Sequence, residues 1–146
     1  MKLSTRGEYA ARAMLELSLH HSEKKLHIRD ISKAQNIPPR FLEQILLALK
    51  RSGLLRSKKG PNGGYSLAMD PGNISVAEVI RAMDGPLAPI DCVSVTSHEI
   101  CPMEDSCGLK WLWKDVRDAI AEILEKTTFQ DLADKTRRAQ KTSAAR

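Results

Sequence analysis

Aromatic residues and cysteines are scarce in this chain of 146 residues, and long apolar runs do not occur in it. No apolar run approaches the roughly 20 residues that a membrane-spanning helix requires, and no apolar block typical of a signal peptide follows the first residues. We therefore expect a cytoplasmic protein with no membrane partner. Three cysteines in a reducing compartment do not suggest a disulfide framework; they are expected to be metal ligands, redox thiols or core residues.

The charged residues are distributed unevenly along the sequence. Residues 1–70 contain 13 Lys and Arg against 6 Asp and Glu, a net charge of +7, whereas residues 71–146 contain 10 against 12, a net charge of −2. A basic N-terminal half indicates a polyanionic partner, of which nucleic acid is the commonest. The hydrophobic content of 42% is sufficient for one packed domain with an additional element.

Two short amphipathic segments joined by a tight turn predict a helix-turn-helix. The first covers residues 28–35 and is broken by Asn36-Ile37-Pro38-Pro39, and the second covers residues 39–52 and is stopped by Gly53. Proline at the first position of the second helix is favourable because its missing N–H would have no partner there. The apolar face expected to be buried on the second helix consists of Phe41, Leu42, Ile45, Leu46 and Leu49.

A basic hairpin is predicted directly after the second of these helices. Residues 54–59 and 65–68 have the pattern of strands, and residues 60–64 between them are rich in glycine and asparagine, which tolerate positive φ. A hairpin in this position is the wing of a winged helix-turn-helix.

Two further helices complete this predicted domain. One extends from Ser4 to His20, with Thr5 and Glu8 spaced as a capping box, and the other covers residues 74–83 with Ser75 as its cap. The expected fold is therefore mainly α-helical with a small β-hairpin wing: a DNA-binding domain at residues 1–83, followed by a long C-terminal dimerisation helix.

Residues 84–108 show no periodicity, and they contain all three cysteines. Pro86, Pro89 and Pro102 prevent a long helix, and a loop of this length in a compact domain usually has a function. The cysteines lack the Cys-x-x-Cys spacing of structural zinc sites, but three thiolates close in sequence suit a soft metal or an iron–sulfur cluster with a fourth ligand from elsewhere. Spacing alone supports incidental cysteines equally well.

The longest periodic segment lies at residues 109–127, within a predicted dimerisation region at residues 109–134. Alternating steps of four and three residues are suited to helix pairing between two subunits. A short helical turn is expected at residues 129–133, and residues 135–146 are polar and basic, which predicts a flexible tail. The apolar positions expected to mediate dimerisation are Leu109, Trp113, Val116, Ile120 and Ile123.

The polar face of the second helix and the basic wing are the predicted DNA contacts. Gln44 can pair with adenine, Glu43 can accept from cytosine N4, and Arg40 can address guanine or phosphate. Basic residues of the wing suit phosphate or minor-groove contacts. The full set of predicted contacts is Ser4, Thr5, Arg6, Arg29, Pro39, Arg40, Glu43, Gln44, Arg51, Arg56, Lys58 and Lys59.

Two other classes of function are less consistent with the sequence. A winged helix could dock on protein, but both candidate DNA-facing elements are basic. An enzyme is not expected, because there is no recognisable set of nucleophile, base and acid, and residues 60–64 lack the Lys-Ser/Thr of a phosphate-binding loop.

Several stretches of the sequence together resemble the Rrf2 superfamily of winged-helix transcription regulators. They are the N-terminal ten residues, residues 41–46, residues 60–65 and the three cysteines before a long helix, and the similarity covers residues 1–135. The resemblance implies a homodimer, joined by the long helix, whose winged helices bind a palindromic operator in double-stranded DNA. In the iron–sulfur branches of the superfamily (IscR, NsrR and RirA), three cysteines hold a cluster near the dimer interface; the matching residues here are Cys92, Cys101 and Cys107.

The fourth ligand of such a cluster differs among the branches. Where one branch has a histidine three residues after the third cysteine, this sequence has Lys110, which cannot ligate while protonated, and the first gap between cysteines is wider than in the cluster-sensing branches. Other members use an acidic residue of the partner's N-terminal helix, so we expect Glu8 in trans, with His98, Glu104 and Asp105 as local alternatives. The cofactor implied is an iron–sulfur cluster, 2Fe–2S in preference to 4Fe–4S.

The resemblance thus implies a repressor whose operator binding responds to redox state, nitric oxide or iron through the cluster. The alternative is a winged-helix regulator that carries a cysteine thiol–disulfide switch and no cluster.

Overall fold

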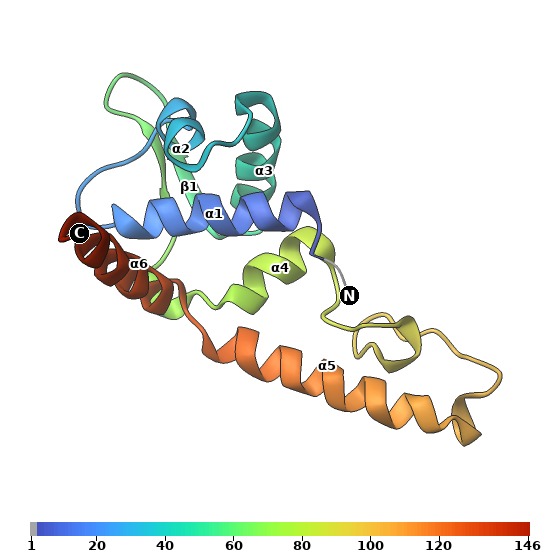
Figure 1. Cartoon of the computed structure of the whole chain (residues 1–146). Helices are drawn as coiled ribbons and strands as arrows, with labels where there is room; N and C mark the ends of the chain where they lie inside the picture. The colour runs from blue at the N-terminus through green and yellow to red at the C-terminus, as the bar shows by residue number, and fades with distance from the viewer. Residues whose placement is uncertain (1–2) are drawn as a thin grey trace.

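The computed structural model describes residues 3–146 and consists mainly of helices with one antiparallel hairpin (Figure 1). Met1 and Lys2, which begin the N-terminal motif, lie outside the described residues. This architecture confirms the predicted fold class. The elements follow in the order α1 (Thr5–Leu19), α2 (Ile28–Gln35), α3 (Pro39–Arg51), β1 (Leu55–Lys58), β2 (Gly64–Leu67), η1 (Pro71–Asn73), α4 (Val76–Asp84), η2 (Asp91–Val93), η3 (Glu104–Ser106), α5 (Gly108–Lys126) and α6 (Phe129–Ala144).

The helix-turn-helix forms as the sequence predicts. Asn36 adopts the left-handed conformation at the end of α2 (φ 53°), and Pro39 is the first residue of α3. Four of the five apolar residues expected inside α3 are buried, but Phe41 is 36% exposed. Its ring meets Tyr9 of α1 edge to face at a centroid distance of 5.5 Å. The burial predicted for Phe41 is therefore wrong, because α1 covers only one side of this ring.

The start of α1 differs from the predicted capping box. Ser4, not Thr5, is the N-cap, and its side chain accepts a hydrogen bond from the Gly7 N–H at 2.9 Å. Glu8 instead forms an ion pair with Arg12 one turn further along the helix, at 2.8 Å. The N-cap lies one residue before the predicted position because Ser4 has the extended backbone that a capping residue needs.

The hairpin packs against the segment that precedes α2. Its strands pair from Leu55 opposite Leu67 to Lys58 opposite Gly64, and Tyr65 forms a bridge with Leu26 through backbone hydrogen bonds of 2.7 and 3.0 Å. This approach requires glycine at position 64: φ is +121°, and a Cβ there would lie 2.6 Å from the Leu26 carbonyl oxygen.

The core is formed mainly by the N-terminal elements together with α4 and one residue of α6. Phe129 is fully buried in it, and Ser75 caps α4 as predicted. A second, smaller cluster joins Ala77, Ile80 and Leu87 to the partly buried Ile120 and Leu124. Through this cluster α5 packs on α4, and it runs along the side of the molecule opposite the hairpin (Figure 1).

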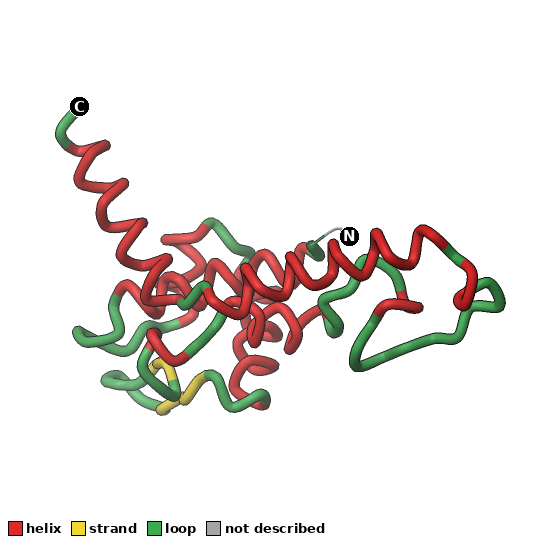
Figure 2. The backbone as a smooth tube through the Cα atoms, turned by 90° about the horizontal axis from the view of Figure 1, so that it is seen from below, coloured by secondary structure: helices red, strands yellow, loops and turns green. Residues whose placement is uncertain are grey.

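The C-terminal segment is a helix and not the predicted tail. α6 continues through Ala144 and projects away from the rest of the chain (Figure 2). Thr128 and Asp131 form a capping box at its start, and Arg137 donates a hydrogen bond to the Leu19 carbonyl of α1 at 2.9 Å. Much of the remainder of α6 consists of residues with high helix propensity, such as alanine, lysine, arginine and glutamine. The polar composition that suggested a tail is therefore compatible with an exposed helix.

No helix among residues 3–146 combines the length and the apolar character needed to cross a membrane.

Candidate nucleic-acid interface

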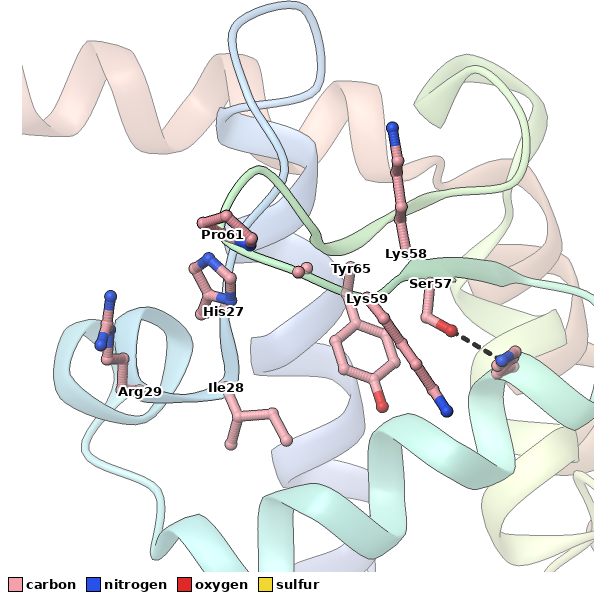
Figure 3. Close-up of a pocket in the computed structure, with 11 residues that line it drawn as sticks. His27, Ile28, Arg29, Ser57, Lys58, Lys59, Pro61 and Tyr65 are labelled. Atoms are coloured by element: carbon pink, nitrogen blue, oxygen red, sulfur yellow. Dashed lines mark hydrogen bonds between the residues drawn. The ribbon is translucent and has the colours of Figure 1, made fainter.

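A basic groove lies between the wing and the helix-turn-helix (Figure 3). Its volume is about 810 Å³, and α2, the C-terminal end of α3 and both sides of the hairpin contribute to it. Five of its lining residues are basic, and none of the residues that the structure places in the lining is acidic. The groove is lined by His27, Ile28, Arg29, Lys50, Ser57, Lys58, Lys59, Gly60, Pro61, Gly64 and Tyr65.

Part of this groove was predicted from the sequence and part was not. Arg29, Lys58 and Lys59 are predicted DNA contacts, and the structure brings them together. His27, Lys50, Ser57 and Tyr65 complete the lining and were missed. Their basic or hydroxyl side chains gave no periodic signal, and only the folding of the hairpin over α2 and α3 places them in one groove.

The surface of α3 presents the predicted recognition residues to solvent. Arg40, Glu43 and Gln44 are exposed, whereas Leu42 and Ile45 point into the core. All twelve predicted DNA contacts are exposed in this structure. A helix with one face buried and the other polar and accessible has the form required to enter a major groove.

The predicted contacts at the start of α1 are exposed but already partly engaged. The Ser4 backbone N–H donates to the Asp84 carboxylate at 3.2 Å, and the Ser4 hydroxyl donates a second hydrogen bond to the same group. Gly7 permits this approach, because a Cβ there would lie 2.5 Å from an Asp84 carboxylate oxygen. Thr5 and Arg6 carry no such contact and remain available at the helix start.

The three cysteines occupy different environments. Cys92 lies half-buried in η2, Cys101 is exposed in a loop, and Cys107 is half-buried at the N-cap of α5. All three are free thiols. Glu8 is on α1 and paired with Arg12.

Glu104 is the centre of an ion-pair cluster beside the cysteines. Lys110 donates a hydrogen bond to it at 2.7 Å, and the His98 ring lies 3.3 Å from its other oxygen. The hydrogen bond from Lys110 is the main reason that the pKa of Glu104 is lowered, and the same bond raises the pKa of Lys110. Two of the local candidates for a fourth ligand, His98 and Glu104, are thus engaged with each other; the third, Asp105, is exposed.

The cysteine side chains are the right kind of ligand for an iron–sulfur cluster, but they are not arranged as a ligand set. Thiolates are the donors that iron–sulfur clusters use. Within residues 3–146, however, no three His, Cys, Asp or Glu side chains lie close enough together to hold a metal ion. The folded single chain therefore does not present an assembled cluster site.

The predicted dimerisation residues lie along one side of α5 but differ in exposure. Leu109 and Ile123 are 61% and 65% exposed, Trp113 and Val116 are partly buried, and Ile120 packs on α4 of its own chain. Leu112, which the sequence analysis omitted, is 50% exposed. The exposed apolar stripe of α5 is Leu109, Leu112 and Ile123.

Comparisons with known proteins agree with this geometry. Residues 3–135 match the Rrf2 family, described as an iron-dependent transcriptional regulator. The chain is 33% identical over 136 residues to the HTH-type transcriptional regulator CymR of Bacillus subtilis, covering 93% of this chain and 92% of that protein. It is 38% identical over 132 residues to the regulator IscR of Xenorhabdus nematophila, covering 90% and 79%.

Solved structures show the same likeness. The structure of B. subtilis CymR, named there as the global cysteine regulator, has a TM-score of 0.79 at 34% identity and covers 92% of this chain and 98% of that one. The structure of T. potens IscR also has a TM-score of 0.79, at 30% identity, and covers 96% and 91%. These relatives are regulators and not enzymes. On the match over residues 3–135 and on the shared winged-helix architecture, the chain belongs to the Rrf2 family of transcriptional regulators.

Proposed function

We propose that this protein is a homodimeric, DNA-binding repressor whose operator binding is controlled through the cysteines of residues 84–108. The observation that best supports DNA binding is the basic groove beside the exposed face of α3. Its lining holds five basic residues and no carboxylate. A groove of this charge attracts the phosphates of a nucleic acid and releases their counterions, which favours binding.

The recognition helix supplies the proposed sequence specificity. The side-chain amide of Gln44 can make two hydrogen bonds with adenine, Glu43 can accept from the amino group of cytosine, and Arg40 can donate to guanine or phosphate. All three lie on the exposed face of α3. The buried face of α3 fixes the helix on the core, so these side chains are presented by a rigid element.

The exposed apolar stripe of α5 supports the proposed dimer. Leu109, Leu112 and Ile123 are at least half exposed on one side of a 19-residue helix, and apolar side chains in such a stripe gain stability when a second copy covers them. Two copies related by a twofold axis would place two recognition helices on half-sites about one helical turn of DNA apart, which predicts a palindromic operator.

The cysteine segment contacts both the DNA-binding domain and the dimerisation helix. Asp84, at its start, bonds Ser4 at the start of α1. Further along the segment, the Val93 carbonyl of η2 accepts a hydrogen bond from Arg117 of α5 at 2.7 Å. We propose that a chemical change at the thiols moves residues 84–108 and, through these contacts, shifts α1 and the spacing of the two recognition helices.

Two forms of thiol chemistry are consistent with this proposal. The iron-dependent description of the family and the IscR relatives support an iron–sulfur cluster on Cys92, Cys101 and Cys107, with Glu8 of the partner subunit as the fourth ligand. In that form residues 84–108 must first rearrange, because one chain does not gather the ligands. The CymR relatives support the second form, a thiol–disulfide switch, and the three free thiols are its reactive groups.

Anaerobic purification with iron and acid-labile sulfide analysis distinguishes the two forms. A coloured protein with stoichiometric iron and sulfide supports the cluster, and a colourless protein with reversible disulfides supports the switch. DNA binding is tested by selecting duplexes from a random-sequence pool and measuring affinity before and after oxidation or cluster removal. Equal affinity in both states would contradict control through the cysteines, and failure to bind any duplex would contradict the DNA-binding function.

A further inference from the structure

The basic groove lies where the backbone of one DNA strand has to pass. In any duplex, a sugar–phosphate strand separates the major groove from the adjacent minor groove. If α3 enters the major groove and the wing reaches the minor groove, which is one of the two placements expected of the wing from the sequence, that strand lies between α3 and the hairpin. The basic groove occupies this position (Figure 3).

Four side chains, from α3, both strands and the turn of the hairpin, converge on one part of this groove. The Lys50 ammonium of α3 donates a hydrogen bond to the Ser57 hydroxyl oxygen of β1 at 2.6 Å. Figure 3 shows the side chains of Lys59 and Tyr65 extending toward α3 on the same side of the hairpin, whereas Lys58 points the opposite way. The ammonium groups of Lys50 and Lys59, the Ser57 hydroxyl and the Tyr65 phenol are therefore presented together.

The chemistry of these groups matches one phosphate. Lys50 has two ammonium hydrogens that Ser57 does not use, and the Ser57 hydroxyl accepts from Lys50 while its own hydrogen stays available to donate. Hydrogen bonds between charged donors and an anionic oxygen are about twice as strong as neutral ones. None of the lining residues described is a carboxylate that would compete for these donors.

The fold holds Lys50, Ser57 and Tyr65 in place before DNA arrives. The bond between Lys50 and Ser57 joins α3 to the wing, and the backbone bridge between Tyr65 and Leu26 joins the wing to the segment before α2. The Tyr65 ring also packs against the core. Prepositioned donors lose little conformational entropy on binding, so more of their interaction energy appears as affinity.

We infer that Lys50, Ser57, Lys59 and Tyr65 form a seat for a single backbone phosphate of the operator, which fixes the register of α3 and the wing on DNA. This inference rests on the proposed DNA-binding function. The seat adds affinity and register without reading a base.

Single methylphosphonate replacements in a selected duplex test the seat, because each removes one phosphate charge. With the wild-type protein, one position per half-site is expected to cost about tenfold in affinity, the fold-change that corresponds to about 1.4 kcal/mol for a charge-assisted hydrogen bond. In Tyr65→Phe, Lys50→Gln and Lys59→Gln, the same replacement should cost less than it does with the wild-type protein, because one of the groups that contact the phosphate has already been lost.

Two control variants isolate the seat from other contacts. Lys58→Gln lowers affinity through net charge but should retain the full methylphosphonate penalty, because its side chain points away from the seat. Gln44→Ala should lose base preference and also retain the penalty. Far-UV circular dichroism verifies that each variant is folded.

The outcomes separate this inference from the function on which it rests. If the penalty persists unchanged in all three seat variants, or if no single phosphate shows one, the seat is wrong while DNA binding stands. If the wild-type protein binds no duplex at all, the proposed function itself fails.

Discussion

Replacing Gly64 by alanine tests whether the close approach of the wing to the segment before α2 stabilises the domain. Gly64 has φ +121°, and a Cβ would lie 2.6 Å from the Leu26 carbonyl oxygen and 2.8 Å from its carbonyl carbon. Backbone atoms cannot rotate away as a flexible side chain can. Gly60 is the matched control, because its φ is +100° but no atom lies within 4 Å of the added Cβ.

The difference between the two variants can be worked from these contacts. An alanine at positive φ costs about 1–2 kcal/mol, and both variants carry this cost. Gly64→Ala must in addition displace the bridge between Leu26 and Tyr65, whose two backbone hydrogen bonds of 2.7 and 3.0 Å are each worth about 0.5–1.5 kcal/mol net. We expect Gly60→Ala to lose about 1–2 kcal/mol of unfolding free energy and Gly64→Ala about 2–5 kcal/mol.

Urea unfolding followed by far-UV circular dichroism measures both values, with the slope m confirming that the two variants unfold like the wild type. Operator affinity measured on the same samples should fall further for Gly64→Ala than for Gly60→Ala, because the displaced bridge positions Tyr65. Equal destabilisation by the two substitutions would refute the reasoning, since the backbone contact would then have no energetic consequence.

Three further predictions follow from other contacts. Ile123→Glu should weaken the dimer by at least about tenfold, because burial of such a side chain is worth about 1.5–3 kcal/mol, and light scattering should then report monomers with an unchanged circular dichroism spectrum. Asp84→Ala removes two hydrogen bonds from Ser4 and should lower the unfolding free energy by about 1–2 kcal/mol; no change in urea unfolding would show that this link is not stabilising. The bond from Lys110 lowers the pKa of Glu104, so the stabilisation it gives is present above the ordinary glutamate pKa and is lost as the pH falls through the lowered value. Tryptophan fluorescence should record this acid transition in the wild type, and Glu104→Gln should abolish it.

Local sequence signals predicted helices α1 to α5, the hairpin and the turns between them. The α2–α3 turn follows from Asn36 and the prolines after it, and the hairpin follows from its glycine-rich loop. These features depend on interactions between residues close in sequence, such as a proline ring that fixes φ or a serine that caps a helix. The basic charge of the N-terminal half likewise indicated a polyanionic partner before any fold was known.

The predictions were wrong where a short sequence pattern was compatible with more than one local structure. Thr5 and Ser4 both precede a plausible first turn, and the bonds from Ser4 to Asp84, distant in sequence, accompany its role as the cap. Residues 135–146 lack the aromatic residues that mark a core, yet a capping box at Thr128 and the buried Phe129 anchor the helix that contains most of them.

The sequence alone therefore determined most of the elements, the basic character of the N-terminal half and the family. Only the tertiary structure decided which side chains share a groove, because Lys50 bonds Ser57 and lies in one groove with Tyr65 only when the hairpin folds back against α3. It also decided which face of α5 remains exposed, since the packing of α4 turns Ile120 inward and leaves Ile123 outside. Periodicity gives the faces of a helix, but the face that is covered depends on the neighbouring element, which a local pattern does not specify.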